Sequence, residues 1–204
     1  MEKLKSTLPN MAASLLVVAA VSAALLAYVN QATAGPIAEQ GKAALENGIK
    51  SVMGGGDIIV VSTDTIGKRK KHVAYKVEKG GKPFGVAIES SANGFGGKLK
   101  TLVGFSEDGE VTGYTILESN ETPGLGTKAQ EWFQKGGKGN IIGRKPSSDK
   151  PLRLKGKEDG GDIDAITAST VTSLAFLKTV NQAHTAYFGK ETDAHTGASK
   201  KAKH

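Results

Sequence analysis

The N-terminal part of the chain is dominated by one long uncharged apolar segment. From Met11 to Val29 the sequence reads MAASLLVVAAVSAALLAYV, without a charged residue. In a helix that rises 1.5 Å per residue, about 20 apolar or small residues span the roughly 30 Å hydrocarbon core of a bilayer. The pattern therefore predicts a transmembrane helix over residues 11–30, preceded by a short N-terminus of residues 1–10.

The charges on either side of this segment predict its orientation. Lys3 and Lys5 precede the span, and no lysine or arginine follows it until Lys42. The positive-inside rule then places the N-terminus in the cytoplasm and the rest of the chain outside a bacterial cytoplasmic (inner) membrane, as a single-pass protein. A cleaved signal peptide is the alternative, because ATA at 32–34 resembles a cleavage site. The apolar run is longer than the usual core of a signal peptide.

The pattern beyond the span changes from helical to alternating and back to helical. Apolar residues at helical spacing predict an amphipathic helix over 37–53 that ends at GGG. Five runs rich in β-branched residues follow, and Asp108-Gly109 between the last two is a hairpin signal. These predicted strands cover residues 57–62, 72–78, 84–90, 99–105 and 110–119. A short helix over 127–135 and a longer one ending near 188 complete an α+β domain of residues 36–190, with an antiparallel sheet and flanking helices.

Composition narrows the classes of function. The chain of 204 residues fits one membrane element and one domain, followed by a polar, lysine-rich tail of residues 191–204 that we expect to be disordered. The absence of cysteine excludes disulfides, a cysteine nucleophile and iron–sulfur ligation by this chain. The net charge of +7 comes from scattered lysines with few aromatic residues, which argues against nucleic acid as a partner. The four histidines do not have the spacing of metal ligands.

The start of the last predicted helix is unusually rich in hydroxyl groups. The stretch GDIDAITASTVTSLAFLKTV, residues 161–180, contains six serines and threonines. If the helix begins near Ala168 with Asp164 or Thr167 as its cap, then Thr167, Ser169 and Thr170 lie at its first turn beside amides without intrahelical acceptors. Such a helix start favours a phosphate-bearing ligand. The alternative is a capped, hydroxyl-rich amphipathic helix without a ligand.

Two glycine clusters are further candidates for a site. NGFGGKL at 93–99 and ETPGLG at 121–126 both suit turns, because glycine supplies positive φ and proline fixes a turn position. Glycine also allows a ligand to approach the backbone closely. In ETPGLG a carboxylate, a hydroxyl and two glycines surround Leu125, a combination that suits a planar ring with polar edges.

The stretches NGFGGKL, ILESNETPGLGTKAQEWF and DAITASTVTS together resemble the G subunit of Rnf-type ion-translocating ferredoxin:NAD oxidoreductases, over nearly the whole chain. The C subunit of the sodium-translocating NADH:quinone oxidoreductase is similar. In that superfamily the motif is an Asp, two residues, Ser or Thr, then usually Gly-Ala-Thr, one further residue and Thr-Ser. The threonine of Gly-Ala-Thr carries FMN through a phosphoester. The matching residues here are Asp164, Thr167, Thr170, Thr172 and Ser173, with Thr170 as the attachment point. The sequence departs from the pattern at Ala168 and Ser169, and the Ser169 hydroxyl could compete as the acceptor.

The resemblance implies an FMN-binding domain that relays electrons through a covalent flavin, as a redox subunit of a multi-subunit translocase without an independent catalytic site. A flavin transferase would attach the FMN, drawing it from FAD. The expected partners are the lipid bilayer and the other subunits of the complex, namely its membrane subunits and its iron–sulfur and flavin subunits. We expect these residues to line the flavin: Glu121, Thr122, Leu125, Gly126 and Lys128. Two alternatives stay open: a membrane-anchored FMN-binding sensory or regulatory module, and a structural domain whose glycines only form turns.

Overall fold

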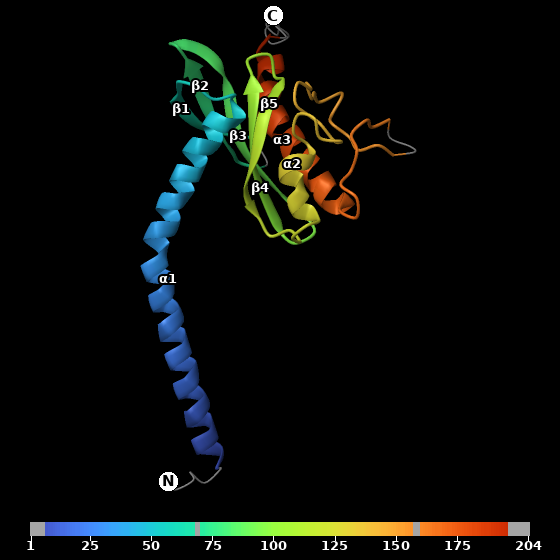
Figure 1. Ribbon diagram of the computed structural model, residues 1–204. Coiled ribbons are helices and arrows are strands. Elements are labelled where there is room, and N and C mark those ends of the chain that lie inside the picture. The colour runs from blue at the N-terminus through green and yellow to red at the C-terminus, as the bar shows by residue number, and fades with distance from the viewer. Residues whose placement is uncertain (1–6, 68–69, 157–159, 196–204) are drawn as a thin grey trace, which may run out of the picture. The chain divides into compact units, whose positions relative to one another are not determined.

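The computed structural model describes residues 7–67, 70–156 and 160–195. Its first element is one continuous helix, α1 (Leu8–Val52), which contains Pro36. The chain divides into two compact units, Met1–Ala44 and Leu45–His204, so that α1 contributes to both. The predicted transmembrane helix and the predicted amphipathic helix are therefore parts of a single element (Figure 1).

The first unit consists mainly of the apolar part of α1. This helix is long and apolar enough to cross a membrane, and none of its most apolar window is buried by the rest of the protein. An apolar helix without protein packing around it fits a membrane span by length and composition. Its large apolar side chains are exposed from Leu8 to Ile37.

The second unit contains a five-stranded antiparallel sheet in which each strand pairs with the next along the chain. The strands are β1 (Ile58–Ile66), β2 (His72–Lys79), β3 (Lys82–Asn93), β4 (Lys98–Ser106) and β5 (Val111–Ser119). All five predicted strands are confirmed. Gly80-Gly81 and Asp108-Gly109 form the tight connections that the sequence indicated. The predicted α+β class with an antiparallel sheet is also confirmed.

Helices cover one face of this sheet (Figure 1). After β5 the chain forms the short 3₁₀ helix η1 (Gly126–Lys128), then α2 (Ala129–Trp132), and after a long connection α3 (Thr170–His195). The α3 helix continues to His195, beyond the predicted end near 188 and into the predicted tail, because no proline interrupts this stretch. The rest of the predicted disordered tail, 196–204, lies outside the described residues.

Aromatic side chains form the centre of the core between α3 and the sheet. Phe176 on α3 stacks on Phe133, with ring centroids 4.4 Å apart, and meets Tyr114 of β5 edge-on at 4.6 Å. The Tyr114 hydroxyl donates to the Ala129 carbonyl at 2.6 Å. These contacts attach α2 and α3 to β5, and thereby hold the first turn of α3 close to the loop that follows β5.

The opposite face of the sheet receives the last turn of α1. Gly104 and Gly113 are paired across β4 and β5, and a Cβ at either one would come within 2.7 Å of the Val52 carbonyl oxygen. The Thr112 hydroxyl donates to that same oxygen at 2.7 Å. Glycine is required at this pair because the end of the helix lies directly on the two strands.

A buried histidine near the far end of α3 makes stability depend on pH. His184 packs against Phe105 and Phe188, with ring centroids 5.6 and 4.7 Å away. Burial, and to a smaller extent the charge of Lys145, lowers the pKa of His184 to about 4. The unfolded chain therefore binds the proton more tightly than the folded domain does, so this contribution to stability is complete above the ordinary pKa of 6.5 and is lost as pH falls toward 4.

We expect His184→Phe to remove that dependence. Wild-type protein should lose about 2 kcal/mol more of its free energy of unfolding between pH 7 and pH 5 than the variant does. Urea unfolding of both proteins at the two pH values is the measurement. Parallel loss in wild type and variant would show that the His184 imidazole is not responsible.

Candidate cofactor site

One buried carboxylate joins the three segments that the sequence singled out. Glu121 follows β5 and is only 6% exposed. Its Oε2 accepts a hydrogen bond from the Thr172 hydroxyl of α3 at 2.8 Å and one from the amide of Gly96, in the loop between β3 and β4, at 3.3 Å. ETPGLG, NGFGGKL and the start of α3 therefore meet at a single side chain.

The glycines around Glu121 are required by close packing. A Cβ at Gly94 would overlap Oε1 of Glu121, and a Cβ at Gly96 would overlap the carbonyl oxygen of Asn120. A Cβ at Gly126 would lie 2.7 Å from Oε2 of Glu121 and 3.0 Å from the Thr172 hydroxyl oxygen. The two glycine-rich stretches thus pack against one another, which the prediction of separate turns did not include.

Three of the six hydroxyl groups in residues 161–180 make hydrogen bonds within the fold. The Ser173 hydroxyl accepts from the amide of Ile166 at 3.0 Å and donates to the Ser169 carbonyl at 2.9 Å, so it closes the turn before the helix. The Thr179 hydroxyl donates to the carbonyl of Phe176 and accepts from Thr101 of β4. With Thr172 bound to Glu121, half of the six hydroxyls serve the fold.

The start of α3 differs from the prediction. The helix begins at Thr170, so Ser169 immediately precedes it and Thr167 lies outside the first turn. The carboxylate of Asp164, predicted as a possible cap, instead pairs with Lys155 at 2.9 Å. The reason is the backbone at Ala168, whose φ of +61° breaks the helical conformation one residue before Ser169.

Ala168 holds a conformation that favours glycine. It is the only non-glycine residue with positive φ in the part of the chain that the structure describes. A left-handed alanine costs roughly 1–2 kcal/mol, because its Cβ crowds the following carbonyl. The surrounding bonds compensate: the Ser169 amide donates to the Ile166 carbonyl at 2.9 Å, and Ser173 holds the same turn. The turn therefore forms with alanine in the position where the resembled motif has glycine.

Exposure separates the two candidate acceptor hydroxyls. Thr170 is exposed at the first position of α3, whereas Ser169 is only 8% exposed. The first amides of α3 have no acceptor within the helix, as at every helix N-terminus. Val171 and Leu125, 51% and 40% exposed, provide apolar surface on the two segments that Glu121 joins. The site thus combines an accessible hydroxyl, backbone donors and an apolar surface.

The remaining predicted residues lie on the same segments. The carbonyl of Thr122 accepts from the amides of Leu125 and Thr127, which shapes the ETPGLG loop, and Lys128 is exposed at the end of η1. Near Asp164, the indole of Trp132 donates to the Asp164 carbonyl at 2.9 Å. Sequence reasoning did not include Phe95 and Gly96 among the site residues, although the glycine cluster around them was the available signal. The described residues contain no group of three potential metal ligands.

The observed groups fit a flavin mononucleotide. The Oε1 atom of Glu121 is buried and has no hydrogen-bond partner among the described residues, so the site retains an unused acceptor. The helix start offers donors to a phosphate, and the exposed Leu125 and Val171 side chains offer a surface to a planar ring. These residues come from elements that the core holds rigidly together.

An α+β domain with such a site, preceded by an apolar helix long enough to cross a membrane, is typical of cofactor-binding subunits with a membrane anchor. Comparison with known proteins identifies the family. A family model described as the FMN-binding domain matches residues 94–185, which include ETPGLG, the start of α3 and all of NGFGGKL except Asn93. A second model, described as the RnfG N-terminal region, matches residues 1–52, which end where α1 ends.

Curated relatives agree with these matches. The G subunit of the ion-translocating oxidoreductase complex of Shewanella amazonensis is 33% identical over 80% of this chain and 80% of its own length. Its counterpart in Photorhabdus laumondii is 32% identical over 83% and 85%. The chain belongs to the family of G subunits of ion-translocating oxidoreductase complexes. Among solved structures, the C subunit of the Na⁺-translocating NADH-quinone reductase of Parabacteroides distasonis matches with a TM-score of 0.47 and 19% identity, covering 58% of this chain and 61% of that one.

Proposed function

We propose that this chain is the electron-transfer subunit of a membrane-bound ion-translocating oxidoreductase, and that it carries FMN as a phosphoester on Thr170. The observation that carries the proposal is the exposure of Thr170 at the first position of α3, next to a loop held by Glu121. The match of residues 94–185 to the FMN-binding domain supports the identity of the cofactor.

The start of α3 suits the phosphodiester. A phosphodiester keeps one negative charge, which the free amides and the dipole of the helix N-terminus stabilise. The Ser173 hydroxyl is already occupied by Ile166 and Ser169, and the Thr172 hydroxyl by Glu121. Thr170 is therefore the exposed hydroxyl of this helix turn, and its neighbours position the backbone without competing for the attachment.

The residues around Thr170 suit the flavin ring. When bound, FMN supplies one- and two-electron redox chemistry, while the protein determines its position and its surroundings. Leu125 and Val171 provide apolar contact on one side of the helix start. The buried Glu121 supports both the loop and the helix, and its Oε1 is available as an acceptor. Thr122, Gly126 and Lys128 complete the loop beside the ring.

Attachment needs a second protein. In the proposed step the Thr170 hydroxyl oxygen attacks the flavin-side phosphorus of FAD, the phosphoanhydride bond breaks, and AMP leaves while the hydroxyl proton passes to a base of the transferase. A threonine hydroxyl is a weak nucleophile without such a base. Cofactor loading tests the proposal: full-length protein from a host with an active flavin transferase should fluoresce after denaturation in a gel. The chain from a host without the transferase should remain dark, and a dark chain from both hosts would contradict the proposal.

The apolar part of α1 suggests where the domain lies. We infer that α1 crosses the cytoplasmic membrane once, with residues 1–10 inside and the FMN-binding domain of residues 36–190 outside, because lysines precede the span and are absent just after it. The bilayer and the other subunits of the complex are then its partners.

Protease accessibility tests this orientation. Protease added to intact spheroplasts should digest the domain, since the proposed topology leaves it outside. A known cytoplasmic protein must stay intact in the same sample as the control. Protection of the domain, under conditions that cleave a known external protein, would reverse the topology.

A further inference from the structure

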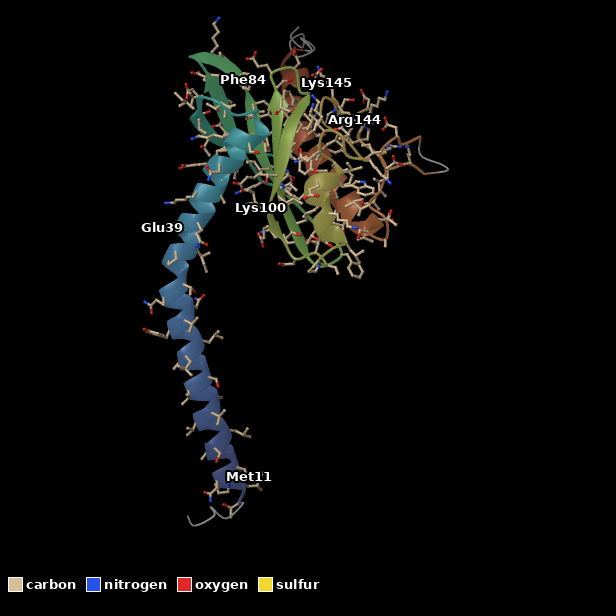
Figure 2. All side chains as sticks on the ribbon, viewed as in Figure 1. Met11, Glu39, Phe84, Lys100, Arg144 and Lys145 are labelled. Atoms are coloured by element: carbon tan, nitrogen blue, oxygen red, sulfur yellow. The ribbon has the colours of Figure 1, made fainter. Side chains whose placement is uncertain are left out.

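The connection between α2 and α3, residues 133–169, is long for a segment whose described residues form no helix or strand. Connections of more than about 15 residues without secondary structure are usually functional or disordered. This one is bonded to the sheet, because the amide of Val111 in β5 donates to the carbonyl of Arg144, on the connection, at 2.9 Å (Figure 2). Its last residues, from Asp164 onward, lead directly to Thr170, so the way they are held bears on the proposed attachment point.

The stretch from Asp164 to Thr170, which we call the attachment loop, is held by buried residues. The carbonyl of Ile163, just before the loop, accepts a hydrogen bond from the amide of Lys155 at 2.8 Å. Within the loop, the amide of Ile166 donates to the Ser173 hydroxyl at 3.0 Å. Both isoleucines are only 1% exposed, whereas the two threonines of the loop are exposed. The loop therefore presents its threonines from a backbone that is anchored in the core.

A side chain of α2 holds the first residue of the attachment loop. Trp132, the last residue of α2, packs against the core, and its indole Nε1 donates to the carbonyl oxygen of Asp164 at 2.9 Å. Gly139 lies between the two groups: a Cβ there would come within 2.7 Å of the same carbonyl oxygen and 2.8 Å of the Trp132 ring. The amide of Gly139 also donates to the Trp132 carbonyl at 3.2 Å. The indole and the start of the loop are therefore packed against each other with no room for a side chain at Gly139.

The carboxylate of Asp164 is held much less firmly than its carbonyl. It pairs with the Lys155 ammonium at 2.9 Å, but the two side chains are 43% and 58% exposed. Exposed ion pairs of this kind contribute little, because water screens them and both side chains lose freedom. The indole–carbonyl bond involves a half-buried ring and a backbone group that cannot rotate away. Trp132 therefore fixes the backbone of the loop, while the Asp164 carboxylate stays accessible to another protein.

We infer that Trp132 is a positioning residue for flavin attachment: its indole N–H holds the carbonyl of Asp164, so that the transferase meets Asp164 and Thr170 on a loop that is already ordered. The inference rests on the proposed function, because it concerns the transfer of FMN to Thr170. Trp132 acts through the backbone of the loop and does not itself react. A binding partner that meets a pre-ordered loop avoids the entropic cost of ordering it, and this saving appears as tighter binding.

The test follows flavin attachment to the full-length chain in detergent. Flavin-free protein, made in a host without the transferase, is mixed with purified flavin transferase and FAD, and covalent flavin is read by gel fluorescence over time at several chain concentrations. Trp132→Phe keeps an aromatic ring and loses the N–H donor. We expect the KM for the chain to rise about 5-fold, the worth of one hydrogen bond, because the loop must then be ordered on binding. The kcat should stay within about twofold, since the bound loop reaches the same geometry.

Two further proteins separate the hydrogen bond from packing and from general loosening of this region. Trp132 is the only tryptophan, so replacing tryptophan by 3-benzothienylalanine changes this residue alone and puts sulfur where the indole N–H was. It should raise KM as Trp132→Phe does. Gln134 makes a bond of the same kind two residues away, because its side-chain amide donates to the Tyr114 carbonyl of β5 at 2.9 Å. Gln134→Met removes that bond without touching the attachment loop, and should keep the wild-type KM and kcat.

The outcomes distinguish this inference from the proposed function. Wild-type KM in the benzothienylalanine protein would overturn the role of the indole N–H, and so would an equal rise of KM in Gln134→Met. Either result leaves FMN on Thr170 and the proposed function intact. Wild-type chain that takes up no covalent flavin from FAD and active transferase would instead overturn the proposed function itself. Circular dichroism of each protein before the reaction verifies that the compared chains are equally folded.

Discussion

Thr170→Ala should eliminate covalent flavin completely while the domain remains folded. The Thr170 side chain is exposed at the first position of α3, so its removal leaves no cavity in the core. The structural hydroxyls of the same turn, on Thr172 and Ser173, keep their partners in Glu121 and Ile166. Gel fluorescence and the intact mass of the denatured chain measure the flavin, and circular dichroism of the same preparation measures the fold.

Ser169→Ala is the matched control for Thr170→Ala. It also removes one hydroxyl from the helix start, but from a residue that is only 8% exposed. We expect this variant to retain the flavin. Flavin that persists in Thr170→Ala and disappears in Ser169→Ala would move the attachment to Ser169.

Gly96→Ala should destabilise the domain by about 2 kcal/mol and reduce its loading with flavin. The added Cβ would overlap the Asn120 carbonyl oxygen, which belongs to the backbone and cannot rotate away. The loop between β3 and β4 would then move off Glu121, and the buried carboxylate would lose its bond from the Gly96 amide. Urea unfolding of the full-length protein in detergent, followed by fluorescence of the single tryptophan, Trp132, measures the change.

A second glycine provides the comparison for Gly96. Gly156 has no atom within 4 Å of the position that its Cβ would take. Gly156→Ala should therefore change the free energy of unfolding by less than about 0.5 kcal/mol. If Gly96→Ala were as stable as Gly156→Ala, the packing of the β3–β4 loop against the chain after β5 would not be as tight as described.

The three segments of the candidate site were visible in the sequence, but the way they pack together was not. NGFGGKL, ETPGLG and the hydroxyl-rich stretch were each visible as unusual local patterns, and their order carried the family resemblance. No local pattern showed that Glu121 would bond to Thr172, because the two residues are brought together by the packing of α3 on the sheet. For the same reason Phe95 was not assigned to the site, since a single aromatic residue in a glycine-rich loop has no periodic partner.

The start of α3 shows where local rules failed. Asp164 and Thr167 were both acceptable as caps, so propensity could not choose between them. The positive φ of Ala168 placed the start at Thr170, and alanine does not signal that conformation as glycine would. Only the surrounding bonds, from the Ser169 amide to Ile166 and from the Ile166 amide to Ser173, offset the strain.

By itself, the sequence determined the elements of this protein whose signals are local. These are the long apolar helix, the five strands with their glycine turns, and the presence of a hydroxyl-rich helix start, because alternation, helical spacing and turn residues act between near neighbours. The tertiary structure alone decided which hydroxyls are used by the fold and which residues, Thr167 and Thr170, stay exposed. That division depends on Glu121, Thr101 and Ile166, which lie on other segments and reach α3 only after the sheet and helix have packed.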